Sequence, residues 1–196
     1  DGSDRGGIID RALDAMGALD ARGASVPPLV EAFTAHAPHR LVPYPGVLEA
    51  LRVLSSDVPV VCVTDGNPRI QNAKLDALGL RRYLRAVVIS DEIVLDGRSG
   101  RSLRKPHPAP FRRALDLLGV PAAEVVHIGD RPAKDLAGAT AAGMRSVRVR
   151  TGEYADLPDN PHRPWGSVDS FAAAVRLVRR HVRGAARGTP AASVGL

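Results

Sequence analysis

Short apolar runs that alternate with segments of helical periodicity constrain the fold of this chain more than any other feature. The runs cover residues 58–63, 86–90, 125–128 and 145–149, and all of them are rich in valine. Apolar strands that are buried on both faces are typical of parallel sheets, whose strands are joined by helices. The sequence therefore predicts an α/β fold with a doubly wound parallel sheet, in which these four strands run in one direction.

Helical spacing divides the chain into three parts. In residues 1–40, apolar positions recur at helical intervals and Pro27-Pro28 begins a second helix, which predicts a small helical hairpin. Residues 41–183 hold the strand–helix alternation and form the predicted core, whereas residues 184–196 are rich in Ala and Gly and predict a disordered tail. The helices expected in the core cover residues 47–54, 68–78, 109–118, 136–142 and 168–182, the last of them capped by Ser167.

Composition excludes several classes of protein. The net charge is +6, but the arginine-rich last helix lacks interleaved aromatic residues, so we interpret it as a solvated face and not as a nucleic-acid surface. No apolar run approaches the roughly 18 residues of a membrane span, and the first residues carry no signal-peptide pattern. The single cysteine, Cys62, predicts a buried thiol, which fits a cytoplasmic compartment. Oligomeric state is left open.

Two carboxylates follow the strand predicted at 125–128. Asp130 comes directly after Gly129, and Asp135 precedes an Ala/Gly-rich helix. Because open α/β sheets bind ligands at the carboxyl ends of their strands, this pair can hold a hard cation such as Mg²⁺, which prefers oxygen ligands. The alternative is purely structural, with Asp130 capping the next turn and Asp135 capping the helix.

A hydroxyl and a lysine stand at comparable positions. Thr64 ends the run at 58–63, where its hydroxyl can donate to a ligand oxygen or serve as an ordinary cap. Lys105 precedes a helix in a chain that has only three lysines. Its compact ammonium suits a phosphate or a pair of carboxylates, and the alternative is an ordinary surface lysine.

Taken in order, these residues resemble the motifs of the haloacid dehalogenase superfamily of phosphatases. Thr64 in Val-Cys-Val-Thr is similar to the second motif, Lys105-Pro106 to the third, and residues 129–135 to the fourth. The resemblance covers roughly residues 40–150, and the hairpin at 1–40 is similar to a reduced cap. It implies a Rossmann-like core and a phosphatase that acts on a small phosphorylated metabolite through an aspartyl-phosphate.

The resemblance also implies a role for each motif residue. The implied phosphate-binding residues are Thr64, Asp65, Gly66 and Lys105. Of these, Thr64 would hydrogen-bond the transferring phosphoryl group, and Lys105 would neutralise its negative charge. Asp130 would bind Mg²⁺, and Asp135 would support the metal from a neighbouring position or through water.

The first motif of the superfamily, Asp-x-Asp-x-Thr after the first core strand, does not occur in the 196 residues. Asp1-Gly2-Ser3 lies at or just beyond the place where it would end. We interpret this as an amino-terminal truncation, and expect the numbered chain to be inactive, marginally stable and open between the strands at 58–63 and 125–128. The alternative is a non-catalytic domain that binds phosphate or a partner.

Overall fold

The strands of the core are short and all run parallel to their neighbours. The computed structural model describes residues 11–17, 27–29, 31–32, 40–93 and 103–186. Its strands are β1 (Val61–Thr64), β2 (Ala86–Ile89), β3 (Val126–Gly129), β4 (Arg145–Val149) and β5 (Gly166–Val168). In this part of the chain they form two sheets, β1-β2 and β3-β4-β5. The predicted parallel α/β architecture is confirmed, but its strands do not form one continuous ladder.

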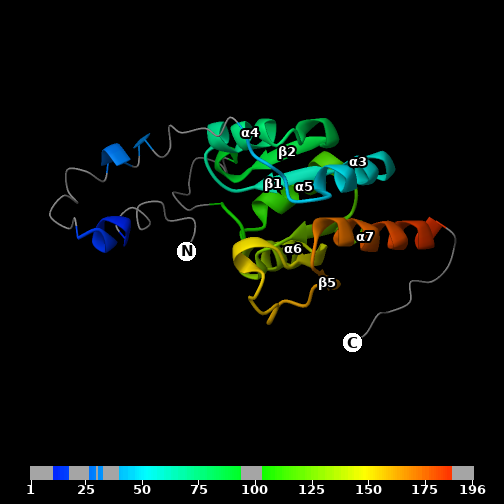
Figure 1. Ribbon diagram of the computed structural model, residues 1–196. Helices are drawn as coiled ribbons and strands as arrows, with labels where there is room; N and C mark the ends of the chain where they lie inside the picture. Colours follow the sequence, from blue (N-terminus) through cyan, green and yellow to red (C-terminus); the bar gives the residue numbers. More distant parts are fainter. Residues whose placement is uncertain (1–10, 18–26, 30, 33–39, 94–102, 187–196) are drawn as a thin grey trace.

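Helices cover both faces of the strands (Figure 1). They are α3 (Val47–Asp57), α4 (Pro68–Ala77), α5 (Ala109–Leu118), the π-helical turn η5 (Pro132–Leu136), α6 (Ala137–Ala141) and α7 (Phe171–Ala186). Successive side chains of β3 point to opposite faces of the sheet and contact different helices. Val126 and Ile128 pack into the core formed with α3 and α7, whereas His127 meets Phe111 of α5. The strands are therefore doubly wound, as predicted.

Two predicted boundaries near the ends of the core are wrong. The strand expected at 58–63 begins only at Val61, because α3 continues to Asp57 and the Val58 N–H still donates to Leu54. Ser167, expected to cap the last helix, lies in β5 instead. The cap is Ser170, whose hydroxyl accepts a hydrogen bond from the N–H of Ala173 at 3.2 Å.

The ends of the chain are described only in part. Within the predicted hairpin at 1–40, residues 11–15, 27–29 and 31–32 are helical, and the rest of that prediction lies outside the described residues. α7 continues to Ala186, three residues into the predicted tail, whose remaining residues also lie outside the described part. No helix among the described residues is long and apolar enough to cross a membrane.

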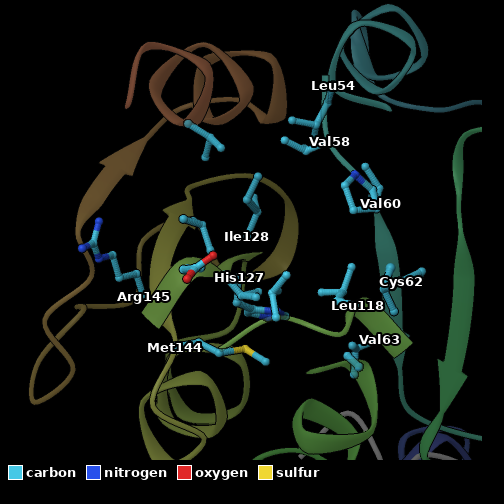
Figure 2. A pocket seen from close by; sticks show the side chains of 18 of the residues that line it. Leu54, Val58, Val60, Cys62, Val63, Leu118, His127, Ile128, Met144 and Arg145 are labelled. Atoms are coloured by element: carbon cyan, nitrogen blue, oxygen red, sulfur yellow. The ribbon is translucent and has the colours of Figure 1, made fainter. Parts of the chain in front are cut away.

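A cavity of about 730 Å³ lies between the two sheets. β1 and β3 do not pair with each other, and each uses only one edge for a ladder within the described chain. Side chains of both strands line the cavity, among them Cys62 and Val63 of β1 and His127 and Ile128 of β3 (Figure 2). The slot expected between the strands near residues 58–63 and 125–128 is therefore present in the structure.

Candidate active site

The residues singled out by their sequence pattern gather at the carboxyl edge of the strands. Thr64 is the last residue of β1, and Asp130 directly follows β3. The chain then turns through η5, which carries Asp135 back against the end of β3. A Cβ on Gly129 would lie 2.4 Å from the Cβ of Asp135, so only glycine allows this close approach. π-Helical turns of this kind are often found at functional sites.

Asp135 is the most enclosed carboxylate of this edge, with only 4% of its side chain exposed. Its Oδ1 accepts a hydrogen bond from Nζ of Lys105 at 2.7 Å, and its Oδ2 accepts one from the N–H of Arg131 at 3.0 Å. Burial acts to raise the pKa of Asp135, but the neighbouring His127 imidazole and the Lys105 ammonium outweigh it and hold that pKa far below its ordinary range. Asp135 is therefore a fixed negative charge.

Lys105 joins the two sheets at this edge. Its backbone N–H donates to Oδ1 of Asp65 at 3.0 Å, and its Nζ lies 3.4 Å from the carbonyl oxygen of Val63 on β1. The same ammonium pairs with Asp135, which follows β3. Burial opposes the charged form of Lys105, yet the charge of Asp135 and their hydrogen bond hold the pKa of the lysine above its ordinary value. The alternative of a plain surface lysine is excluded, because only 13% of the side chain is exposed.

Asp130 lies close enough to Asp135 and Lys105 for their charges to shift its pKa, but no described hydrogen bond joins it to either side chain. Its pKa is raised, first by burial and then by the negative charge of Asp135, while Lys105 acts weakly in the opposite sense. Two carboxylates that repel each other in a partly buried place favour a cation between or beside them. Among the described residues, no group of three or more His, Cys, Asp and Glu side chains is placed to hold a metal alone.

The β1 end of the site is held by polar contacts that the sequence did not reveal. The Thr64 hydroxyl donates to Oε1 of Gln71 on α4 at 3.0 Å, and the Gly66 N–H donates to the Ser90 hydroxyl at 3.3 Å. Asp65 points toward Lys105, as described above, and not toward open space. Thr64, Asp65 and Gly66 therefore form an ordered turn at the carboxyl end of β1.

Three further side chains belong to this edge and were not predicted. Nε2 of His127 lies 3.6 Å from Oδ1 of Asp135, and this buried atom has no hydrogen-bond partner among the residues that the structure describes. Lys134 reaches from η5 to within 3.8 Å of Oδ2 of Asp65, and Arg131 stacks over the ring of Tyr154 at 4.3 Å. Arg131 and Lys134 lie between Asp130 and Asp135 in the sequence, so their position could have identified them as residues of the predicted site. His127 was hidden inside an apolar run.

The assembled edge combines a buried lysine–carboxylate pair, a second carboxylate, a hydroxyl and several cations at the carboxyl ends of β1 and β3. Cations beside a hydroxyl and a strand-end turn suit a tetrahedral oxyanion, and the carboxylate of Asp130 suits a divalent cation that accompanies it. This set of groups can bind a phosphate ester and stabilise the charge of its transferring group.

Comparison with known proteins agrees with this chemistry. The family profile of haloacid dehalogenase-like hydrolases matches residues 8–143. The chain is 40% identical to a glyceraldehyde 3-phosphate phosphatase of Methanopyrus kandleri over 118 residues, which are 60% of this chain and 47% of that protein. It is 33% identical to a phosphoserine phosphatase of Thermus thermophilus over 156 residues, 79% of this chain and 53% of that protein. The chain thus spans about half the length of these curated relatives.

Solved structures show the same likeness. A 2-haloacid dehalogenase from Pseudomonas syringae superposes with a TM-score of 0.62 at 26% identity, covering 90% of this chain and 70% of that one. A phosphatase of the same superfamily from Thermococcus onnurineus superposes with a TM-score of 0.57 at 25% identity, covering 72% and 58%.

Proposed function

Because this chain belongs to the haloacid dehalogenase-like hydrolases, we propose that it is the core of a Mg²⁺-dependent phosphatase for a small phosphorylated metabolite. The observation that carries this proposal is the buried Lys105–Asp135 pair at 2.7 Å, which stands beside Asp130 at the carboxyl edge. The relatives named as phosphatases support phosphate-ester hydrolysis over dehalogenation.

Each residue of the edge has a role in this proposal. Lys105 neutralises negative charge on the phosphoryl group, and Asp135 holds the ammonium in place. The Thr64 hydroxyl and the Gly66 N–H, now bonded to Gln71 and to the Ser90 hydroxyl, exchange these partners for phosphoryl oxygens. Phosphoryl transfer depends mostly on positioning and charge stabilisation, which these groups supply.

The donor set fits Mg²⁺ in a particular way. Both oxygens of Asp135 already accept hydrogen bonds, whereas Asp130 has a pKa raised by burial and by a neighbouring negative charge. Asp130 is therefore the direct ligand, and Asp135 supports it from behind. Mg²⁺ commonly takes one or two protein carboxylates together with water and phosphate oxygens. When bound, the ion supplies further charge neutralisation at the phosphoryl oxygens.

The nucleophile of the proposed reaction is an aspartate on a strand that fills the cavity between β1 and β3. Both strands offer an unused edge to this cavity within the described chain, and its walls are apolar. A parallel strand placed there would pair on both sides and end beside Lys105 and Asp130. No Asp-x-Asp pair occurs in the 196 residues, so the numbered chain alone does not form an aspartyl-phosphate in this proposal.

The test compares two polypeptides, the numbered chain and a version extended by the residues encoded upstream of Asp1. We expect Mg²⁺-dependent phosphate release and a higher unfolding temperature only in the extended form. In that form, Lys105→Ala and Asp130→Ala should each lower kcat/KM by roughly a hundredfold or more, because each removes charge stabilisation at the reacting group. The matched controls are Lys74→Ala and Asp116→Ala, which change exposed residues on α4 and α5.

Two outcomes would decide against the proposal. Parent rates in both site variants, on a substrate that the extended form clearly hydrolyses, would remove Lys105 and Asp130 from the mechanism. An extended form that binds phosphate but never releases it from esters would favour a non-catalytic phosphate-binding or partner-binding domain, the alternative supported by the absent Asp-x-Asp pair. Equal activity of the two lengths would show that the nucleophile lies elsewhere.

A further inference from the structure

Arg131 presents a guanidinium at the rim of the site with one face covered by an aromatic ring. Its Cζ lies 4.3 Å from the centroid of the Tyr154 ring. In the described part of the chain, no carboxylate lies within ion-pair distance of this guanidinium. A cation–π contact uses the face of the guanidinium, and the N–H donors in its plane remain available for another group.

Lys134 adds a second positive charge on the same turn. The pKa of Lys134 is lowered, first by burial and then by the charge of Arg131, while Asp65 acts in the opposite sense. Lys134 thus lies in the field of Arg131, and its Nζ also lies 3.8 Å from Oδ2 of Asp65. An anion bound at Arg131 would favour the charged form of Lys134.

The position of the aromatic partner is set by buried groups. Arg148 of β4 is fully buried, and its Nη2 donates to the Tyr154 carbonyl oxygen at 2.5 Å. The same guanidinium pairs with Asp159 at 3.2 Å, and Arg150 pairs with the other oxygen of that carboxylate at 3.0 Å. Two arginines thus hold the segment after β4 in place, so Tyr154 is a fixed platform for Arg131.

We propose that Arg131, stacked on Tyr154 and assisted by Lys134, is a subsite for a carboxylate carried by the leaving group of the substrate. The planar fork of a guanidinium matches a carboxylate with two parallel hydrogen bonds. The charge of Arg131 acts on the carboxyl of Asp130, so its guanidinium lies within electrostatic reach of the proposed phosphate site. This inference rests on the proposed function for the location of the phosphate, and it narrows the substrate class to small phosphate esters that bear a carboxylate.

The subsite is tested by binding, so that the test does not depend on turnover. Phosphonoacetate and ethylphosphonate are close in size, and only the first carries a carboxylate. Isothermal titration calorimetry of the protein should give phosphonoacetate a Kd lower by roughly tenfold or more, as expected for a charge-assisted bidentate contact. Arg131→Met should abolish this difference, and Arg131→Lys should reduce it, because lysine keeps the charge without the fork.

Arg82→Met is the matched control, because Arg82 also stacks on a tyrosine, with its Cζ 4.9 Å from the Tyr83 ring centroid, but lies away from the site. It should leave the Kd ratio unchanged. Circular dichroism of each variant checks folding, and Arg131→Lys keeps the test decisive if Arg131→Met does not fold.

The outcomes separate this inference from the phosphatase proposal. A carboxylate preference that depends on Arg131 supports the subsite even where no ester is hydrolysed, and in that case only the phosphatase assignment fails. Equal Kd values for the two phosphonates, or a preference that survives in Arg131→Met and Arg131→Lys, would overturn the subsite. No binding of either phosphonate would overturn the phosphate site on which both proposals rest.

Discussion

Gly129→Ala tests whether the close approach between the end of β3 and Asp135 organises the site. The added methyl would lie 2.4 Å from Cβ, 2.6 Å from Cγ and 2.7 Å from Oδ2 of Asp135. Carbon atoms in contact normally stay about 3.5–4.0 Å apart, so Asp135 must move by roughly 1 Å. β3 cannot yield easily, because it is hydrogen-bonded to β4 along its length.

Two contributions determine how much Gly129→Ala lowers the free energy of unfolding. Forcing one extra methyl into a packed place costs typically 1–3 kcal/mol of stability. Asp135 and Lys105 have only 4% and 13% of their side chains exposed, so moving the carboxylate also weakens a buried ion pair. Loss of one partner of such a pair costs about 3–5 kcal/mol, and a displaced partner costs a part of that. We therefore expect Gly129→Ala to lower the free energy of unfolding by about 2–5 kcal/mol.

The assay is urea unfolding followed by the fluorescence of Trp165, the single tryptophan, which packs against the core of α3, β4 and α7. Gly166→Ala is the matched control, because its methyl would meet the flexible end of one side chain, Cδ2 of Leu177 at 2.6 Å. It should cost clearly less than Gly129→Ala. A double-mutant cycle with Lys105→Met adds a second criterion, since both changes act on the same ion pair and their costs should be less than additive.

Two results would refute this reasoning. If Gly129→Ala and Gly166→Ala cost the same, the contact with Asp135 has no special weight. If the costs of Gly129→Ala and Lys105→Met simply add, the methyl does not act through the ion pair.

Three further predictions concern the surrounding structure. The pKa of Asp135 is held below its ordinary range, so its contribution to stability is present above about pH 4 and is lost as the pH falls further. Asp135→Asn should therefore make the free energy of unfolding in urea depend less on pH between pH 2 and 7. Arg148→Met should lower the unfolding free energy by about 1–3 kcal/mol, because it leaves the Tyr154 carbonyl oxygen without this donor and Asp159 with the more exposed Arg150; exposed Arg113→Met should change it little, and equal effects would contradict the prediction. Gly138→Ala should destabilise by about 1–3 kcal/mol, because its methyl would lie 2.1 Å from Cε2 of Phe111, and an unchanged thermal midpoint would argue against that packing.

The sequence by itself determined the elements of the core and most of the candidate residues. Valine-rich runs beside helical periods predict parallel strands, because only a strand buried on both faces can be apolar throughout. Carboxyl ends of parallel strands meet at one edge, which is why residues far apart in the chain, such as Thr64 and Asp130, were expected at one site. The strand β5 escaped this reasoning, because Gly-Ser-Val carries no apolar alternation and its pairing with β4 alone makes it a strand.

Only the tertiary structure decided which partner each polar group takes. Lys105 was expected to suit a phosphate or a pair of carboxylates, and its ammonium pairs with one particular carboxylate, Asp135, thirty residues away, because η5 brings it against the end of β3. Arg131 finds Tyr154 through the segment after β4, which two arginines hold on Asp159. Such contacts depend on distances between elements that local patterns do not encode, since a side chain's partner is set by packing and burial and not by its neighbours in the chain.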